Sequence, residues 1–306
     1  MPENRASFSR AQMKQRLRGV YTALITPFRD GAVDEKCLRD LVEIQVASGV
    51  DGLVPAGTTG ESPTLSHEEN VRVIRVCVEA AKGRLPVLAG TGSNSTSEAL
   101  DLSRRARDAG ADGLLVVAPY YNRPTQRGLI LHYEAIMREV DLPLVLYNIP
   151  GRTGVNVEPE TIFALKRTGN LAGVKEASGL ADQVSKIVEL CGPDLSVLSG
   201  DDSLTLPFMA VGAVGVISVV SNVAPRETHD MVRAWRDGRR DDAMALHRRL
   251  FPLVKALFSE TNPVPVKTAL SMMGKCLPDL RLPLAPMEEG NAARLLSAMR
   301  AFGLKA

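Results

Sequence analysis

One lysine in this chain is placed for covalent chemistry. Lys175 follows the residues Leu-Ala-Gly-Val at 171–174, a short apolar run typical of a parallel strand buried on both faces. Burial removes water from an ammonium group and lowers its pKa, and the neutral amine that results is a nucleophile towards ketones. The alternative is a lysine that ends a strand and extends its ammonium group into solvent. The lysine alone leaves both interpretations open.

Tyrosines end two other apolar runs. Tyr147 closes the run at 143–147, and Tyr120 and Tyr121 follow the run at 113–118. Imine formation needs a group that moves protons beside the amine, and a phenol can serve. The alternative is a core aromatic ring whose hydroxyl tip is hydrogen-bonded. Because aromatic residues make up only 4% of the chain, three tyrosines at the ends of apolar runs favour a functional role.

Two loops carry groups that bind anions. The turn Gly57-Thr-Thr-Gly60 offers two hydroxyls, and its flanking glycines let backbone amides approach a carboxylate closely. It lacks the lysine of a phosphate-binding loop, which disfavours a nucleotide. Arg152, in the loop Pro-Gly-Arg-Thr-Gly, can form a bidentate pair with a carboxylate. An ordinary turn and a solvated arginine are the alternatives.

The elements that must position these residues follow from a repeated pattern. Short apolar runs alternate with amphipathic stretches, and each run has the length expected of a buried parallel strand. Eight such runs occur, at residues 20–25, 52–55, 86–89, 113–118, 143–147, 171–175, 195–199 and 214–218.

Helix signals between the runs support the alternation. Ser66 with Glu69, and Ser95 with Glu98, are each spaced as capping boxes ahead of apolar residues at helical intervals. Pro159 stands where the first turn of a helix tolerates proline. Gly110 and Gly169 stand where helices end.

Eight strand and helix units predict an α/β fold, a (β/α)8 TIM barrel with a C-terminal helical extension. We expect a polar N-terminal segment at 1–18, the barrel at 19–240, and C-terminal helices packed on the barrel at 241–306. Active sites of such barrels lie at the C-terminal ends of the strands, which is where Tyr147 and Lys175 stand.

Composition limits the partners. The 306 residues are 45% hydrophobic and 24% charged, with a formal net charge of +2 and no long block of like charges, which disfavours nucleic acid and favours a small molecule. No apolar run approaches the ~20 residues that span a bilayer, so neither a membrane partner nor a secretory signal is expected. Four scattered cysteines and four histidines without ligand spacing predict a cytoplasmic protein without a bound metal.

Taken together, the motifs resemble those of the dihydrodipicolinate synthase and N-acetylneuraminate lyase family, from about Gly19 to Met287. The matching motifs, which occur in the family's order, are Gly57-Thr-Thr-Gly-Glu61, Tyr120-Tyr-Asn-Arg-Pro124, Tyr147-Asn-Ile-Pro-Gly-Arg-Thr-Gly154, Gly173-Val-Lys-Glu-Ala177, Ser199-Gly-Asp-Asp202 and Asn262-Pro-Val-Pro-Val-Lys267.

The resemblance implies a role for each site residue. Lys175 would form a Schiff base with pyruvate, and Thr58, Tyr147 and Tyr121 would form a proton relay. Thr59 would hold the pyruvate carboxylate. Arg152 would bind the carboxylate of L-aspartate-4-semialdehyde. Gly200 and Ile217 resemble the positions whose backbone lines the pyruvate pocket. In this family the second tyrosine of the pair comes from a neighbouring subunit, so a homotetramer, built as a dimer of dimers, is implied.

The implied reaction is the condensation of pyruvate with L-aspartate-4-semialdehyde in lysine and diaminopimelate biosynthesis, without a cofactor, because the protonated imine is the electron sink. The alternatives are other aldolases and lyases of the family, acting on N-acetylneuraminate, 2-keto-3-deoxygluconate or 4-hydroxy-2-oxoglutarate, and a 2-oxo-acid sensor without turnover. The Thr58-Thr59 pair and the Arg152 loop favour the first.

The resemblance also extends to a feedback site for lysine. The corresponding residues are His67, Asn94, Glu98 and Tyr120. Asn70 and Pro63, however, stand where lysine-sensitive relatives often have a histidine and a small residue. We therefore expect weak or absent inhibition by lysine.

Overall fold

The protein is described here by a computed structural model that covers residue 8 and residues 10–305. All eight expected strands are present, each within two residues of its predicted bounds, and they pair in parallel in the order β4-β1-β10-β9-β8-β7-β6-β5. Their bounds are β1 (Gly19–Ala23), β4 (Gly52–Val54), β5 (Leu88–Gly90), β6 (Gly113–Val117), β7 (Leu144–Asn148), β8 (Leu171–Glu176), β9 (Ser196–Ser199) and β10 (Gly215–Ser218).

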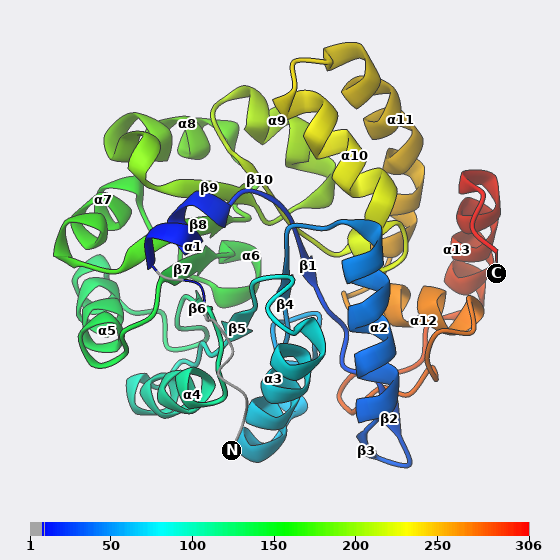
Figure 1. The fold of residues 1–306 in the computed structure, drawn as a ribbon, viewed down its shortest axis with the longest axis horizontal. Helices are drawn as coiled ribbons and strands as arrows, with labels where there is room; N and C mark the ends of the chain where they lie inside the picture. The colour runs from blue at the N-terminus through cyan, green and yellow to red at the C-terminus, as the bar shows by residue number, and fades with distance from the viewer. Residues whose placement is uncertain (1–7, 9, 306) are drawn as a thin grey trace.

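The sheet closes into a barrel between β4 and β5. A parallel bridge joins Leu53 to Val87, and the Gly90 amide donates to the Pro55 carbonyl at 3.0 Å. Closure leaves no unpaired sheet edge. The predicted (β/α)8 barrel is therefore confirmed, and Figure 1 shows its helices arranged around the strands.

Helices follow the strands around the ring. They are α2 (Glu35–Ser48), α3 (His67–Ala81), α4 (Thr96–Asp108), α5 (Gln126–Glu139), α6 (Pro150–Thr153), α7 (Pro159–Thr168), α8 (Ala181–Cys191), α9 (Thr205–Ala210) and α10 (Pro225–Arg236). Short 3₁₀ turns η1 (Ser62–Thr64), η2 (Gly192–Asp194), η3 (Asp202–Leu204) and η4 (Val220–Asn222) link some of them. In the described part of the chain, no helix is long and apolar enough to cross a membrane.

The predicted helix starts have different outcomes. The capping box of α3 is confirmed, since the Ser66 amide donates to Glu69 and the Glu69 amide donates to the Ser66 hydroxyl. The second predicted capping box, Ser95 with Glu98, is wrong in one of its two hydrogen bonds. The Glu98 amide donates to the Ser95 hydroxyl, but the Glu98 carboxylate accepts from Ser93 at 2.7 Å instead of capping Ser95.

The barrel is filled from inside and closed at one end. Inward side chains such as Tyr21, Leu115 and Leu198 form one apolar cluster, to which α1 (Arg10–Arg16) and the residue after it contribute Met13 and Leu17. Leu17 lies against Gly173, at the start of β8, so α1 covers the N-terminal end of the barrel, beside β8 and β9 in Figure 1. Of the polar segment expected at 1–18, residues 1–7 and 9 lie outside the described part.

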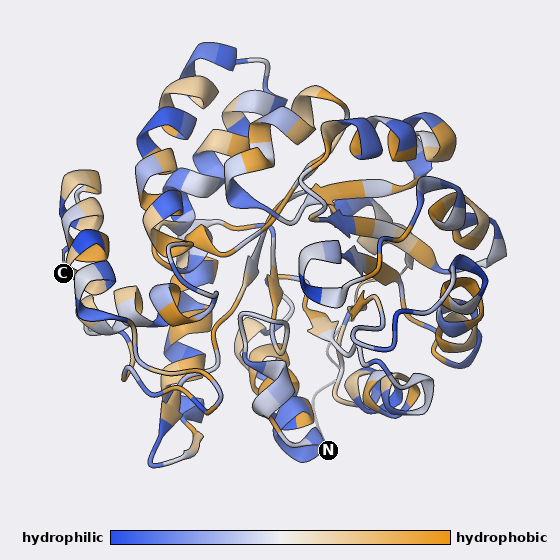
Figure 2. Cartoon of the chain, turned by 180° about the vertical axis from the view of Figure 1, so that it is seen from behind, coloured by the Kyte–Doolittle hydropathy of each residue, from blue (hydrophilic) through white to orange (hydrophobic). Residues whose placement is uncertain are grey.

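A larger core lies between the strands and the helices. In Figure 2 the orange, apolar residues gather on the strands and on the sides of the helices that face them, whereas blue residues lie outside. Burying apolar surface on both sides of each strand explains why the strands read as continuous apolar runs.

Three helices beyond the ring pack on one side of the barrel. They are α11 (Arg240–Leu257), α12 (Val264–Met272) and α13 (Glu289–Phe302), the last two drawn in orange and red beyond α2 in Figure 1. A hairpin of β2 (Phe28–Arg29) and β3 (Ala32–Val33), which the sequence did not predict, reaches towards them. The Lys267 ammonium lies 4.1 Å from the centre of the Phe28 ring.

A buried ion pair ties this extension to the barrel. Lys267 of α12 donates to the Glu61 carboxylate, and both side chains are 0% exposed. The other Glu61 oxygen accepts from the Arg281 amide at 3.2 Å, and Lys267 also donates to the Asp279 carbonyl at 2.8 Å. Both charges are therefore paired and hydrogen-bonded, as buried charges must be.

Replacing Lys267 by Met should leave the buried Glu61 charge without a partner. We expect a loss of about 3–5 kcal/mol in the free energy of unfolding, measured by urea denaturation. The exposed pair Lys36–Asp40 provides the control, since Lys36→Met should change stability by about 0.5 kcal/mol or less. The double variant Glu61→Gln with Lys267→Met should recover much of the loss. A Lys267→Met protein as stable as the native one would contradict this account.

Candidate active site

Two buried side chains meet where β7 and β8 end. Tyr147 and Lys175 are register partners on these neighbouring strands, and both point into the barrel. Each is only 5% exposed, and the Lys175 Nζ atom lies 4.0 Å from the centre of the Tyr147 ring. The alternative interpretation, in which Lys175 ends a strand and extends its ammonium group into solvent, is thereby excluded.

The surroundings of Lys175 favour its neutral form. Burial lowers the pKa of Lys175 from 10.5 to about 7, and the charge of Arg152 acts in the same direction, whereas the charge of Asp202 raises it. The free amine is therefore far more populated at neutral pH than it is for an exposed lysine. A free amine beside a cavity can attack a ketone.

Tyr147 keeps its proton and has a partner. Burial raises the pKa of Tyr147 to about 12, and a hydrogen bond with the Thr58 hydroxyl partly opposes that rise. The phenol is therefore protonated at neutral pH. Lys175, Tyr147 and Thr58 thus lie in series from the buried amine to the turn after β4: the amine lies over the Tyr147 ring, and the Tyr147 hydroxyl is hydrogen-bonded to Thr58.

The turn after β4 is held in a fixed conformation. Thr59 is 3% exposed and accepts a hydrogen bond from the Asn262 side chain at 3.0 Å. Two residues later, Glu61 adopts a positive φ of 56°, a conformation that a non-glycine residue occupies only when its surroundings require it. Its buried pairing with Lys267 supplies that requirement.

Three further predicted substrate contacts lie around the same centre. Arg152 is exposed on α6 and donates to the Asn262 carbonyl at 3.1 Å. Gly200 leaves room for the lysine, because a Cβ atom there would lie 3.2 Å from Lys175 Cε and 2.7 Å from the Ala177 side chain. Ile217 is 1% exposed and belongs to the inner cluster that also contains Tyr147.

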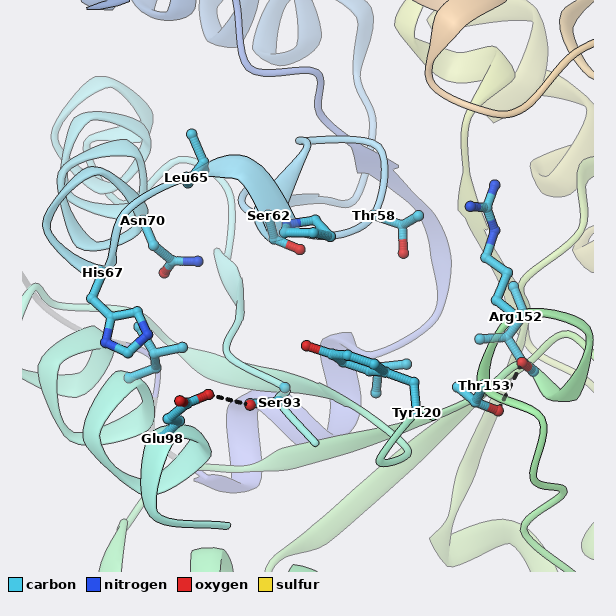
Figure 3. A pocket seen from close by; sticks show the side chains of 15 residues that line it. Thr58, Ser62, Leu65, His67, Asn70, Ser93, Glu98, Tyr120, Arg152 and Thr153 are labelled. Atoms are coloured by element: carbon cyan, nitrogen blue, oxygen red, sulfur yellow. Dashed lines mark hydrogen bonds between the residues drawn. The ribbon is translucent and has the colours of Figure 1, made fainter. Parts of the chain in front are cut away.

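A cavity of about 360 Å³ opens beside these residues. Figure 3 shows Thr58 and Arg152 on one side of it, His67 and Glu98 on the other, and Tyr120 between them. Lys175 and Tyr147 do not line it directly, and Thr58 is the member of their series that faces it. The cavity therefore leads from the predicted feedback site to the predicted catalytic residues.

Not every predicted residue reaches this centre. Tyr121 is 89% exposed, with a positive φ of 70°, and within one chain it is not brought to Lys175. Asn94 does not line the cavity. Its main-chain carbonyl accepts a hydrogen bond from the Asn122 side chain at 2.8 Å. The places of both residues in a relay or a lysine site stay predictions.

Two residues in the quoted motifs have contacts that the sequence did not assign. Asn262 touches Thr59 and Arg152, although it follows no strand. Asp202 is buried, and its Oδ2 atom accepts from the amides of Val219 and Val220 at 2.9 and 3.0 Å. Burial raises the pKa of Asp202, and these hydrogen bonds oppose the rise. Asp202 could have been suspected as a carboxylate at a strand end, but Asn262 carried no such signal.

The fold and this centre define a class of protein, a closed parallel barrel with a buried lysine and a tyrosine at adjacent strand ends, suited to imine chemistry. The model of the Dihydrodipicolinate synthetase family matches residues 16–301, and the chain belongs to this family. Among the described residues, no group of three or more His, Cys, Asp or Glu side chains is arranged to hold a metal ion.

Individual relatives agree with the family assignment. The chain is 54% identical over 287 residues to the 4-hydroxy-tetrahydrodipicolinate synthase of Nitratidesulfovibrio vulgaris strain DP4, covering 94% of this chain and 98% of that protein. It is 52% identical to the synthase of the same name from Pelobacter propionicus, covering 94% and 99%. The crystal structure of dihydrodipicolinate synthase from Aquifex aeolicus superimposes with a TM-score of 0.93 at 48% identity, covering 94% and 99%.

The low pKa of Lys175 predicts how imine formation depends on pH. Below about pH 7 the amine is protonated and cannot attack, so the rate of pyruvate attachment should rise about tenfold per pH unit and level off above pH 7. The rate can be measured by trapping the imine with cyanoborohydride and following the intact mass. An exposed lysine of ordinary pKa would show a rate that continues to rise well above pH 7, and that result would contradict the burial argument.

Proposed function

We propose that this chain is a 4-hydroxy-tetrahydrodipicolinate synthase, which condenses pyruvate with L-aspartate-4-semialdehyde through a Schiff base on Lys175. The observation that carries the proposal is the buried Lys175 amine beside Tyr147, at the strand ends of a barrel of this family. The names of relatives more than 50% identical over 94% of the chain support this choice among the family's reactions.

The first half of the reaction concerns pyruvate. The Lys175 amine attacks the ketone carbon, the carbinolamine loses water, and a protonated imine remains. Tyr147 would donate the proton that leaves with the hydroxyl, and Thr58, its hydrogen-bond partner, would connect it to the cavity. Thr59 and the amides of its turn hold the carboxylate. The Tyr147 phenolate that results then takes a methyl proton, which restores the phenol and gives the enamine, the carbon nucleophile.

The second half forms the new bond. The enamine carbon adds to the aldehyde of L-aspartate-4-semialdehyde, whose carboxylate pairs with Arg152 at the rim of the cavity. The substrate's own amino group then attacks the imine carbon and closes the ring. This attack expels the Lys175 amine, so the enzyme is regenerated and 4-hydroxy-tetrahydrodipicolinate leaves. The protonated imine accepts the electron pair, and no cofactor is required.

The assembled form and the compartment belong to the same proposal. Tyr121, exposed beside the cavity residue Tyr120, would enter the relay of a neighbouring copy, so the protein would act as a homotetramer built from two dimers. Its four free cysteines suit the reducing cytoplasm. Lysine would inhibit it weakly or not at all. Asn70 and Pro63 line the cavity at positions where lysine-sensitive relatives often have a histidine and a small residue.

Turnover tests the proposal directly. The native protein, given pyruvate and L-aspartate-4-semialdehyde and coupled to dihydrodipicolinate reductase, should consume NADPH, whereas Lys175→Ala should not, because no imine forms. Lys186→Ala removes an exposed lysine of α8 and should keep native activity. Native protein that is silent where a known synthase works would move the assignment to another aldolase of the family. Turnover by Lys175→Ala would overturn the imine mechanism.

Tyr147→Phe tests the proton relay separately. Losing the hydroxyl should lower kcat by about 10²-fold to 10⁴-fold, the usual contribution of a positioned acid or base. The phenyl ring still fills the core, so the thermal midpoint should change little. A core aromatic without a chemical role would give the opposite pattern, with kcat retained. The matched change Tyr133→Phe, at a buried tyrosine of α5, controls for loss of a buried hydroxyl.

A further inference from the structure

We infer that Asn262 is a positioning residue that couples the two carboxylate sites of the reaction, an inference that rests on the proposed function. Its side-chain amide donates to the Thr59 hydroxyl at 3.0 Å, and its main-chain carbonyl accepts from the Arg152 guanidinium at 3.1 Å. Thr59 is the proposed anchor of the pyruvate carboxylate, and Arg152 is that of the second substrate. One residue thus contacts both anchors.

The contact to Thr59 sets the direction of its hydroxyl. An amide nitrogen can only donate, so the Thr59 oxygen accepts, and the hydroxyl proton stays available for an anion. Asn262 is 6% exposed and Thr59 is 3% exposed, so water does not compete for this bond. Asn262 therefore prepares Thr59 as a donor towards a carboxylate.

The contact with Arg152 limits the number of conformations that this long side chain can adopt. Arg152 is exposed, and a long exposed arginine samples many rotamers unless one end is held. The Asn262 carbonyl occupies one of its five N–H donors and leaves the others for a carboxylate. Because this carbonyl and the Thr59 contact belong to the same residue, a shift at one anchor moves the other.

The chain segment after Asn262 holds this residue in place. Five residues later, Lys267 forms the buried pair with Glu61, which lies two residues after Thr59. The segment 262–267 therefore contacts the turn 59–61 at both ends. Asn262 Oδ1 is buried without a hydrogen-bond partner among the described residues, so the only side-chain hydrogen bond that Asn262 makes there is the one to Thr59.

Two substitutions separate the donor role from a packing role. Asn262→Ala removes the donor and should raise the KM for pyruvate about fivefold to tenfold, the effect of one hydrogen bond. Asn262→Asp keeps the shape but can only accept, so it captures the Thr59 proton and adds a negative charge beside the carboxylate. It should therefore raise this KM further than Asn262→Ala. Both variants keep the main-chain carbonyl that Arg152 contacts, so the KM for the semialdehyde should rise less than the KM for pyruvate, with kcat little changed.

The matched control is Asn291→Ala. Asn291 on α13 donates to Glu260 at 2.6 Å, so this variant disturbs the C-terminal helices without touching Thr59 or Arg152. Both KM values should stay native. If Asn291→Ala raises them as much as Asn262→Ala does, Asn262 acts only through the packing of the extension and the inference fails.

A double-mutant cycle tests separately whether Asn262 acts through Thr59. When Asn262 acts through Thr59, adding Asn262→Ala to Thr59→Val should not raise the KM for pyruvate beyond that of Thr59→Val alone. Additive effects would overturn the inference, as would an Asn262→Asp variant that binds pyruvate better than Asn262→Ala. Imine trapping with pyruvate alone separates failure of this inference from failure of the proposed function. Native protein that forms no adduct with pyruvate would overturn the proposed function as well.

Discussion

Desolvation of one amine is the constraint on which the rest of the structure depends. Lys175 is 5% exposed and has a pKa near 7, so its neutral form persists only while water is kept from it. The tyrosine ring beside it and the closed end of the barrel serve that exclusion, and the glycine at position 200 leaves room for the lysine side chain. A parallel barrel provides it readily, because its strands are covered on both faces.

Two charged side chains near that amine shift its pKa in opposite directions. The Asp202 carboxylate raises the pKa of Lys175, and the Arg152 guanidinium lowers it. A buried carboxylate favours any cation near it, so in the proposed mechanism Asp202 would work against the free amine before attack and in favour of the protonated imine afterwards. A pKa near 7 would then balance a good nucleophile against a stable cationic intermediate.

The sequence predicted the strands and the site residues on them because both follow local rules. A strand buried on two faces is an apolar run, and polar residues at its end face the site, which placed Tyr147 and Lys175. Gly200 was predicted from the family resemblance alone. Contacts between distant segments have no such signal. The α1 cover over the barrel, the β2–β3 hairpin and the bond from Asn262 to Thr59, 203 residues apart, arise only from tertiary packing. Tyr121 is 89% exposed, and its proposed role would need a second chain.

The long-range contacts that the sequence did not reveal have a common purpose. Thr58, Thr59 and Glu61 lie on a turn with a positive φ, which would relax if it were held only by its own hydrogen bonds. The buried Glu61–Lys267 pair contributes little net stability compared with apolar packing, but it can be satisfied in one arrangement only. Asn262, Lys267 and Arg281 of the C-terminal extension therefore hold the turn in this geometry, across about 200 residues of sequence.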